Sequence, residues 1–154
     1  KMYVKLTNGN VDTYPYNVRQ LRRDNPNTSF PKRIPDEMLS EWGVYPVTVA
    51  DVPSFTDRTQ TVSQEAAPKG SGSSWTVGWT VTDKTAEEVQ QYDDGVAASN
   101  RSTRDALLSD TDWTQVADAP VDATAWATYR QALRDITSHA NWPNLEDADW
   151  PTKP

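Results

Sequence analysis

The sequence predicts an α+β fold. A small N-terminal module rich in β-hairpins is expected over residues 1–84, and a helical hairpin with an extended tail rich in tryptophan and proline is expected over residues 85–154. Residues 75–82 alternate strictly between apolar and small side chains, as a half-buried strand does. Thr85 and Glu88 have the spacing of a capping box, which marks the start of a helix. Later in the chain, apolar residues recur at helical spacing, so a helical half follows a β-rich half.

The chain opens with a predicted β-hairpin. Residues 2–6 alternate, which places three apolar side chains on one face of a strand. Asn8-Gly9 follows, and it is a strong two-residue turn signal because both positions tolerate a positive φ. Residues 11–16 are therefore predicted to be the returning strand.

Two short helices and a strand are predicted next. The first helix covers residues 16–23 and is broken by Asp24-Asn25-Pro26. The second covers residues 35–43, with proline at its start and glycine at its exit. Residues 44–49 are rich in β-branched side chains, so we expect another strand there.

A second hairpin is predicted over residues 58–82. Residues 58–65 form its polar strand, and residues 66–74 form a long connector of glycine, serine and proline. The apolar residues of the returning strand share one face: Trp75, Val77, Trp79 and Val81. That face is either part of the core of the N-terminal module or an edge that meets another chain.

The first C-terminal helix is predicted at about residues 85–109. The residues expected along its buried seam are Val89, Tyr92, Val96, Thr103 and Leu107. Its middle is weakly apolar, so the helix needs packing from outside itself. The partner is either the second helix or another copy of the chain.

The second C-terminal helix is predicted at about residues 122–137. Asp122 has the chemistry of a helix cap, and Pro120 ends any helix that runs into it. The side chains on its apolar stripe are Trp126, Tyr129, Leu133 and Ile136. Trp142-Pro143 and Trp150-Pro151 then predict an extended tail.

Composition excludes several classes of site. The chain has no cysteine and one histidine, so disulfides, thiolate metal sites and histidine-cluster metal sites are excluded. Asp110 and Asp112 resemble part of a calcium loop, but the glycine and the final glutamate of an EF-hand are missing. No nucleophile or carboxylate pair lies in a recognisable catalytic setting, and no glycine-rich phosphate loop precedes a helix. We therefore expect no catalytic residue, no metal and no cofactor.

Charge is distributed unevenly along the chain. The formal net charge is −7, which argues against nucleic-acid binding, and no apolar run approaches the length of about 20 residues that a membrane span needs. Residues 1–84 hold ten basic and nine acidic side chains, whereas residues 85–154 hold five basic and thirteen acidic ones. The basic side chains that cluster in the first half are Arg19, Arg22, Arg23, Lys32 and Arg33. This cluster is either an ordinary solvated face or a surface that meets an acidic partner or another copy.

The C-terminal third carries a string that is more specific than a generic helix pattern. The string is Trp126-x-x-Tyr129-Arg130-Gln131-x-Leu133-Arg134-Asp135-Ile136, with Arg104-Asp105-x-Leu107-Leu108, Asp112-Trp113-Thr114 and Pro120 before it and Trp150-Pro151 after it. With these motifs the segment resembles the bacteriophage tail assembly chaperone family. The sequence departs from the family pattern at residues 137–141, where a turn containing proline is expected.

A second resemblance lies near the N-terminus. Residues 20–31, which read QLRRDNPNTSFP, and Gly43-Val44-Tyr45-Pro46-Val47 are similar to an N-terminal module of small phage tail-associated proteins. Both resemblances imply the same biological setting.

The resemblance implies a small non-enzymatic protein associated with phage tail fibres. Three functions stay open: a virion component that attaches or braces a tail fibre or baseplate, an assembly chaperone that dissociates afterwards, and a carbohydrate-binding module. We expect the first, with the protein made in the host cytoplasm, placed in the virion tail and bound in several copies to other tail proteins, without nucleic-acid or membrane partners. The candidate partner-contact residues are Arg19, Arg22, Arg23, Trp75, Trp79, Trp113, Trp142 and Trp150. For the tryptophans, packing in a core or an interface outweighs a role as sugar-stacking platforms.

Overall fold

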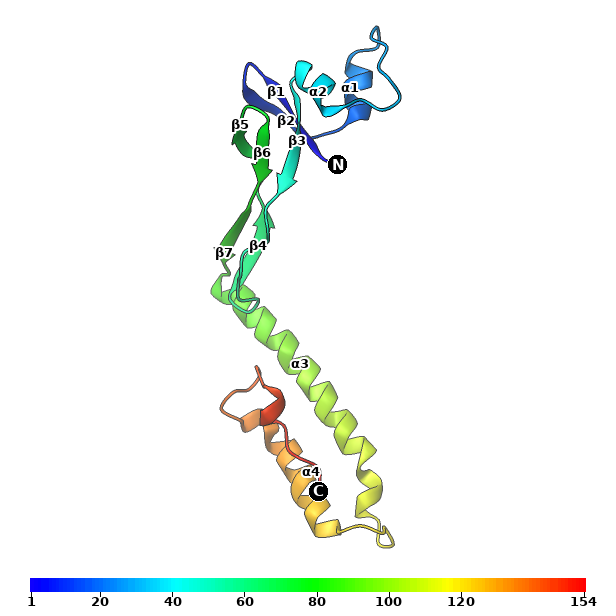
Figure 1. The fold of residues 1–154 in the computed structure, drawn as a ribbon. Coiled ribbons are helices and arrows are strands. Elements are labelled where there is room, and N and C mark those ends of the chain that lie inside the picture. The colour runs from blue at the N-terminus through cyan, green and yellow to red at the C-terminus, as the bar shows by residue number, and fades with distance from the viewer. The chain divides into compact units, whose positions relative to one another are not determined.

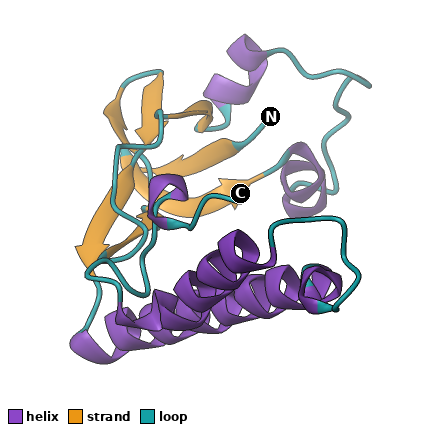
Figure 2. Ribbon diagram, turned by 90° about the horizontal axis from the view of Figure 1, so that it is seen from below, coloured by secondary structure: helices purple, strands orange, loops and turns teal.

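The computed structural model describes all 154 residues, which form two compact units, Lys1–Asp83 and Lys84–Pro154 (Figure 1). The first unit holds seven strands and two short helices, and the second holds two longer helices with three short 3-10 turns. Figure 2 separates the strands from these longer helices by colour. The predicted α+β fold class is confirmed.

Five strands of the first unit form one mixed sheet in the order β2-β1-β3-β6-β5. Their bounds are β1 Tyr3–Thr7, β2 Asn10–Tyr16, β3 Val44–Val49, β5 Lys69–Ser71 and β6 Ser74–Val77. Strand β1 pairs antiparallel with β2 and with β3, and β5 pairs antiparallel with β6. The β3–β6 pair is parallel, so the chain leaves the sheet between these strands and returns to it.

The first hairpin forms as predicted. Asn8 and Gly9 make the turn between β1 and β2, with φ values of 52° and 78°. Lys5 lies opposite Thr13, and Thr7 lies opposite Asn10. Positive φ at both central positions produces the twist that a two-residue hairpin needs.

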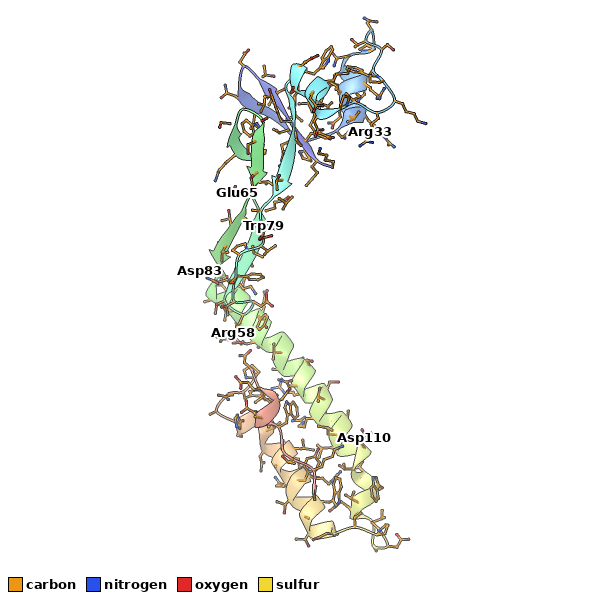
Figure 3. The ribbon with its side chains drawn as sticks, in the orientation of Figure 1. Arg33, Arg58, Glu65, Trp79, Asp83 and Asp110 are labelled. Atoms are coloured by element: carbon orange, nitrogen blue, oxygen red, sulfur yellow. The ribbon has the colours of Figure 1, made fainter.

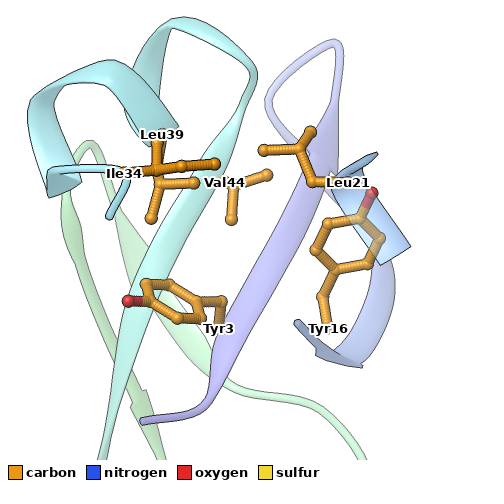
Figure 4. Close-up of a cluster of buried hydrophobic side chains, with 6 residues drawn as sticks. All are labelled: Tyr3, Tyr16, Leu21, Ile34, Leu39 and Val44. Atoms are coloured by element: carbon orange, nitrogen blue, oxygen red, sulfur yellow. The ribbon is translucent and has the colours of Figure 1, made fainter. Parts of the chain in front are cut away.

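The main core lies between one face of this sheet and the helices α1 (Val18–Asp24) and α2 (Asp36–Glu41). Six buried side chains form it, as Figure 4 shows: Tyr3, Tyr16, Leu21, Ile34, Leu39 and Val44. Helix α1 starts with a reciprocal cap, in which Gln20 N donates to Asn17 Oδ1 and Asn17 N donates to Gln20 Oε1, both at 3.0 Å. This cap fixes where α1 begins and so which side of it faces the sheet.

A second cluster covers the opposite face of the sheet. Its buried members are Val4, Val47, Trp75 and Val77. Side chains alternate along a strand, so neighbouring residues such as Tyr3 and Val4 contribute to different clusters. Both faces of the central strands are therefore apolar.

The prediction of one continuous strand over residues 75–82 is wrong. Gly78 interrupts it, and β7 (Trp79–Asp83) leaves the main sheet to pair antiparallel with β4 (Gln60–Gln64) in a separate two-stranded ribbon. At the break, Glu65 N donates to Gly78 O at 2.9 Å. Period-2 alternation indicates an extended chain but carries no information about which strand it pairs with.

The predicted connector over residues 66–74 also needs correction. It contains β5, whose three residues pair with β6 through Lys69 opposite Thr76 and Ser71 opposite Ser74. An added Cβ at Gly70 would lie 2.0 Å from Ser74 O, so this glycine allows the close approach of the two strands. The glycine and serine content of this segment predicted a loop, but Gly70 instead allows β5 to pair closely with β6.

The second unit is a helical hairpin. It consists of α3 (Ala86–Asp110), a 3-10 turn at Asp112–Gln115, α4 (Ala123–Asp135), and two further 3-10 turns at Ile136–Ser138 and Asp147–Asp149. Both predicted helices are confirmed to within two residues at their starts and ends. No helix of the structure combines the length and apolar character that crossing a membrane would require.

Both helix starts are capped as predicted. Glu88 N donates to Thr85 Oγ1 at 3.2 Å, and Thr85 N donates to Glu88 Oε2 at 2.7 Å. Asp122 Oδ1 accepts from Thr124 N at 3.0 Å and from Ala125 N at 3.1 Å. These side chains satisfy N–H groups that have no partner inside the helix.

The predicted seam of α3 is only partly correct. Tyr92 and Thr103 are exposed, Val89, Val96 and Leu107 are half-buried, and the one residue of the helix in the buried class is Ala97. Helix α3 has too few large apolar residues to define its buried side by periodicity alone. Its buried side follows from contacts with the C-terminal tail around Ala97 and with α4 at the C-terminal end of the helix.

Turns near residues 140–143 and the 3-10 turn at Asp147–Asp149 interrupt the predicted extended tail, which also packs on α3. Asn100 Nδ2 of α3 donates to Pro143 O at 2.7 Å. Asn144 Nδ2 donates to Asp93 Oδ1 at 2.9 Å. The side-chain amides of Asn100 and Asn144 therefore hold the tail against α3. The Trp-Pro pairs of the sequence do not predict these contacts.

Candidate partner-binding site

Arg130 is buried in the helical hairpin where α3 ends. The residue is 7% exposed, although it carries a charge. Its Nη1 donates to Leu108 O at 2.5 Å and to Thr111 Oγ1 at 2.8 Å, and its Nη2 donates to Asp112 Oδ1 at 2.5 Å. The last carbonyls of a helix lack intrahelical partners and favour positive charge. Arg130 of α4 therefore acts as a tertiary cap for the C-terminus of α3.

Two buried threonines complete this turn. Thr111 is 3% exposed and donates from Oγ1 to Leu107 O at 2.7 Å. Thr114 is fully buried and donates from Oγ1 to Thr111 O at 2.6 Å, while Gln115 Nε2 donates to Thr114 Oγ1 at 3.1 Å. Every buried side-chain polar atom of the structure has a hydrogen-bond partner. A fully satisfied polar network of this kind holds the turn in one geometry.

An aromatic row crosses the surface of this turn. Trp113 is 50% exposed, and its ring centroid lies 6.4 Å from that of the half-buried Trp126. Trp126 meets Tyr129 edge-to-face at 5.7 Å, and burial raises the pKa of the Tyr129 hydroxyl. Val116, in the following loop, is 53% exposed. We call Trp113, Val116 and Trp126 the tip patch.

The surroundings of the tip patch are acidic. Asp110, at the end of α3, is labelled in Figure 3, and Asp118 and Asp122 in the loop are also exposed. Asp112, considered above as part of a calcium loop, accepts the hydrogen bond from Arg130 instead. The tip therefore presents an apolar centre surrounded by acidic side chains, and an apolar centre with a polar rim is typical of protein-binding surfaces.

Residues 97–154 match the family model described as phage tail assembly chaperone protein. The match confirms the resemblance identified from the motifs in this part of the chain and supports a phage tail-related role. It begins inside α3 and includes the whole turn with Arg130 and Trp113. No curated protein and no solved structure matched the chain. We refer to residues 97–154 as the chaperone-family segment.

The five tryptophans predicted to contact partners differ in how far they are exposed to solvent. Trp75 is 7% exposed and lies in the core, where its Nε1 donates to Gly72 O at 2.9 Å. Trp79 is half-buried, and its Nε1 donates to Ala50 O at 2.8 Å. Trp142 and Trp150 are also half-buried. Trp113 is the most exposed of the five.

The three arginines predicted to contact partners also differ. Arg19 and Arg23 are exposed on α1. Arg22 is half-buried, and its Nη2 donates to Pro31 O at 2.7 Å and to Lys32 O at 3.3 Å. Arg22 therefore holds a loop in place, whereas Arg19 and Arg23 are exposed to solvent or to a partner.

Arg130 was missed as a functional residue because the helical pattern was read from apolar side chains alone. The available signal was its position in the sequence, next to Tyr129 and three residues before Leu133, at the edge of the apolar stripe. An arginine there has either to extend to solvent or to find acceptors beside the helix. The acceptors lie 18 to 22 residues away along the chain.

Proposed function

We propose that this chain is a non-enzymatic bacteriophage tail protein that binds another tail protein through the tip patch and stays in the virion as an adaptor for a tail fibre or baseplate. The observation that carries the proposal is Trp113, half-exposed on a turn that buried hydrogen bonds hold, inside the chaperone-family segment. Exposed tryptophans on rigid supports are typical centres of protein interfaces.

The rigidity of the turn favours binding. A side chain that is already held in place loses less conformational entropy on association, so more of its contact energy appears as affinity. Trp113 touches Trp126, and Trp126 touches the buried Tyr129, so its ring is supported from the core outward. Removing such an anchor typically weakens binding by about 2–4 kcal/mol.

Virion composition tests the proposal. Quantitative mass spectrometry of purified particles should detect the protein at a fixed ratio to the other tail proteins. Particles grown with Trp113→Ala should contain at least tenfold less of it, because a loss of about 2–4 kcal/mol weakens binding by a factor of about 30 to 1,000. Tyr92→Ala is the matched control, because Tyr92 is also an exposed aromatic of the second unit but lies on α3 outside the chaperone-family segment. Equal loss with both variants would contradict a role for the tip patch.

A dissociating assembly chaperone is the second candidate, and the description of the matching family favours it. The same tip patch would then bind a tail protein only during assembly. Abundance separates the two functions: a protein present in infected cells and absent from mature particles is a chaperone. A protein retained in both is an adaptor.

The non-enzymatic part of the proposal rests on composition. The chain has one histidine and no cysteine, and its histidine, His139, is exposed, with Nε2 3.7 Å from Asp149 Oδ1. Asp149 in turn accepts from Asn141 Nδ2 and Glu146 N. Turnover of a host glycan that is abolished by substituting one acidic residue would refute this part.

A further inference from the structure

A groove opens in the first unit, far in sequence from the tip patch. Its main hollow has a volume of about 720 Å³, and a second hollow of about 510 Å³ shares part of its lining. The lining includes the apolar side chains of Tyr3, Val18 and Ile34, which we call the floor, and the basic residues Lys1, Arg19, Lys32 and Arg33, of which we call the last three the rim. Figure 3 labels Arg33. We call this hollow with its rim the basic groove.

The charges of the basic groove do not cancel internally. Asp36 on its wall forms an ion pair with the side-chain Nζ of Lys1 and also accepts a hydrogen bond from Tyr3 Oη at 3.5 Å. The three rim residues form no ion pair within the chain, and Glu37 is the remaining acidic residue of the lining. The lining therefore keeps an excess of positive charge beside an apolar floor.

The loop that carries Lys32 and Arg33 is held in place from behind. Arg22 donates to three consecutive carbonyls of this loop, those of Phe30 at 3.4 Å, Pro31 at 2.7 Å and Lys32 at 3.3 Å. The Phe30 ring packs edge-to-face on a tryptophan at 5.2 Å. Arg22 thus positions Lys32 and Arg33, which reduces the conformational entropy that these two side chains lose when they bind a partner.

We propose that the basic groove binds an acidic polypeptide segment, with carboxylates on Arg19, Lys32 and Arg33 and one apolar side chain on the floor formed by Tyr3 and Ile34. The proposal is independent of the tip patch, because the groove lies outside the chaperone-family segment. Complementary charge sets the register of such a segment, and the floor adds apolar burial.

A peptide fits the groove better than a polyphosphate does. A nucleic acid backbone carries a negative charge at every phosphate, and Glu37 on the wall, which unlike Asp36 has no ion-pair partner, opposes such an uninterrupted run of charge. Backbone N–H groups of a peptide give Glu37 a donor that a nucleic acid backbone lacks. The mixed lining therefore favours carboxylates spaced along a polypeptide.

Fluorescence anisotropy with a labelled heptapeptide, Asp-Glu-Asp-Leu-Glu-Asp-Glu, tests the proposal on the full chain. We expect a Kd of about 10–100 µM at about 25 mM NaCl, and at least fivefold weaker binding at about 200 mM NaCl. The amide version of the peptide, with Asn and Gln in place of the acids, should bind at least tenfold more weakly. Failure of the acidic peptide to bind at about 1 mM would overturn the proposal.

Charge reversal locates the site. The double variant Lys32→Glu/Arg33→Glu should weaken peptide binding at least tenfold, while Arg23→Glu should change it less than twofold. Arg23 is the matched control because it is exposed on the same unit but does not line the groove. Circular dichroism checks that each variant is folded. Equal effects per charge at Arg23 and at the rim would mean a general field effect and would refute a defined site.

Two further results would also refute the proposal. Tighter binding of an oligothymidylate than of the acidic peptide would identify a polyphosphate site. Self-association at low salt that Arg33→Glu abolishes, without any peptide binding, would identify a second copy of the chain as the occupant. As a positive check, Arg22→Gln should weaken peptide binding severalfold, because it releases the loop without touching the peptide.

Discussion

Replacing Arg130 by alanine should destabilise the helical hairpin by about 2–4 kcal/mol. Removing one partner of a buried ion pair usually costs about 3–5 kcal/mol. The value here is lower because the Asp112 side chain is 67% exposed and is solvated again when the guanidinium is lost. Leu108 O also keeps its hydrogen bond from Thr111 N at 3.2 Å. The remaining cost is the lost hydrogen bonds and the space left by a buried side chain.

Two substitutions separate the causes of this effect. Arg134→Ala removes the same side chain one turn later on α4, where it is exposed, and should cost less than about 0.5 kcal/mol. Arg130→Lys keeps the charge but loses the planar arrangement of donors that reaches several acceptors at once, so its cost should lie between the two.

Urea denaturation of the full chain, followed by circular dichroism at a helix-sensitive wavelength, measures these effects. The second unit contains the two long helices, so its unfolding dominates this signal. If Arg130→Ala and Arg134→Ala shift the midpoint equally, the cap on α3 is not a stabilising contact and the reasoning is refuted. Arg130→Ala also bears on function: without Arg130 the turn should lose its single geometry, so incorporation into virions should fall although Arg130 is not part of the tip patch.

Further predictions concern packing, backbone conformation and pH. Leu133 is fully buried, so Leu133→Ala should cost about 2–5 kcal/mol in urea denaturation, whereas Gln131→Ala on the exposed side should cost less than about 0.5 kcal/mol; equal costs would mean that the phase of α4 is wrong. Gly43 has a φ of +68° and an added Cβ would lie 2.8 Å from a backbone carbonyl oxygen, so Gly43→Ala should cost about 2–4 kcal/mol, against about 1–2 kcal/mol for Gly72→Ala, whose φ is also positive but whose surroundings are open. Burial and a hydrogen bond to a carboxylate raise the pKa of Tyr16. Its contribution to stability should therefore be complete below about pH 10 and be lost as the pH rises further, since the unfolded chain then gives up its proton first; Tyr16→Phe should show a shallower loss in alkaline denaturation.

Helix starts and tight turns followed directly from the sequence. Thr85 with Glu88, Asp122 and Asn8-Gly9 all behave as their residue types predict. Each of these features depends on side chains within three residues of the backbone groups they serve. Local chemistry was sufficient there.

The pairing of β1 with β2 and of β4 with β7 agrees with the two predicted hairpins, whereas the rest of the strand pairing and the path of the tail did not follow from the sequence. The parallel pairing of β3 with β6 and the return of the tail to Asn100 join segments that lie far apart in the chain, and the break at Gly78 places β6 and β7 in different sheets. The sequence pattern of an isolated segment is the same whichever distant segment it meets. Pairing partners are chosen by the free energy of the whole assembly, so only the tertiary structure reveals them.

The candidate site divides in the same way. By itself the sequence determined that the second helix has one apolar stripe, that Trp113 lies in a segment that resembles the phage tail assembly chaperone family, and that basic residues cluster near Arg22. Only the tertiary structure decided that Trp113 is exposed while Trp75 is buried, that Arg22 supports a loop, and that Arg130 caps a helix formed some twenty residues earlier. The physical reason is that burial and hydrogen-bond partners depend on neighbours in space. A tryptophan or an arginine has the same intrinsic chemistry at every position, and its surroundings decide whether it binds a partner or stabilises the fold.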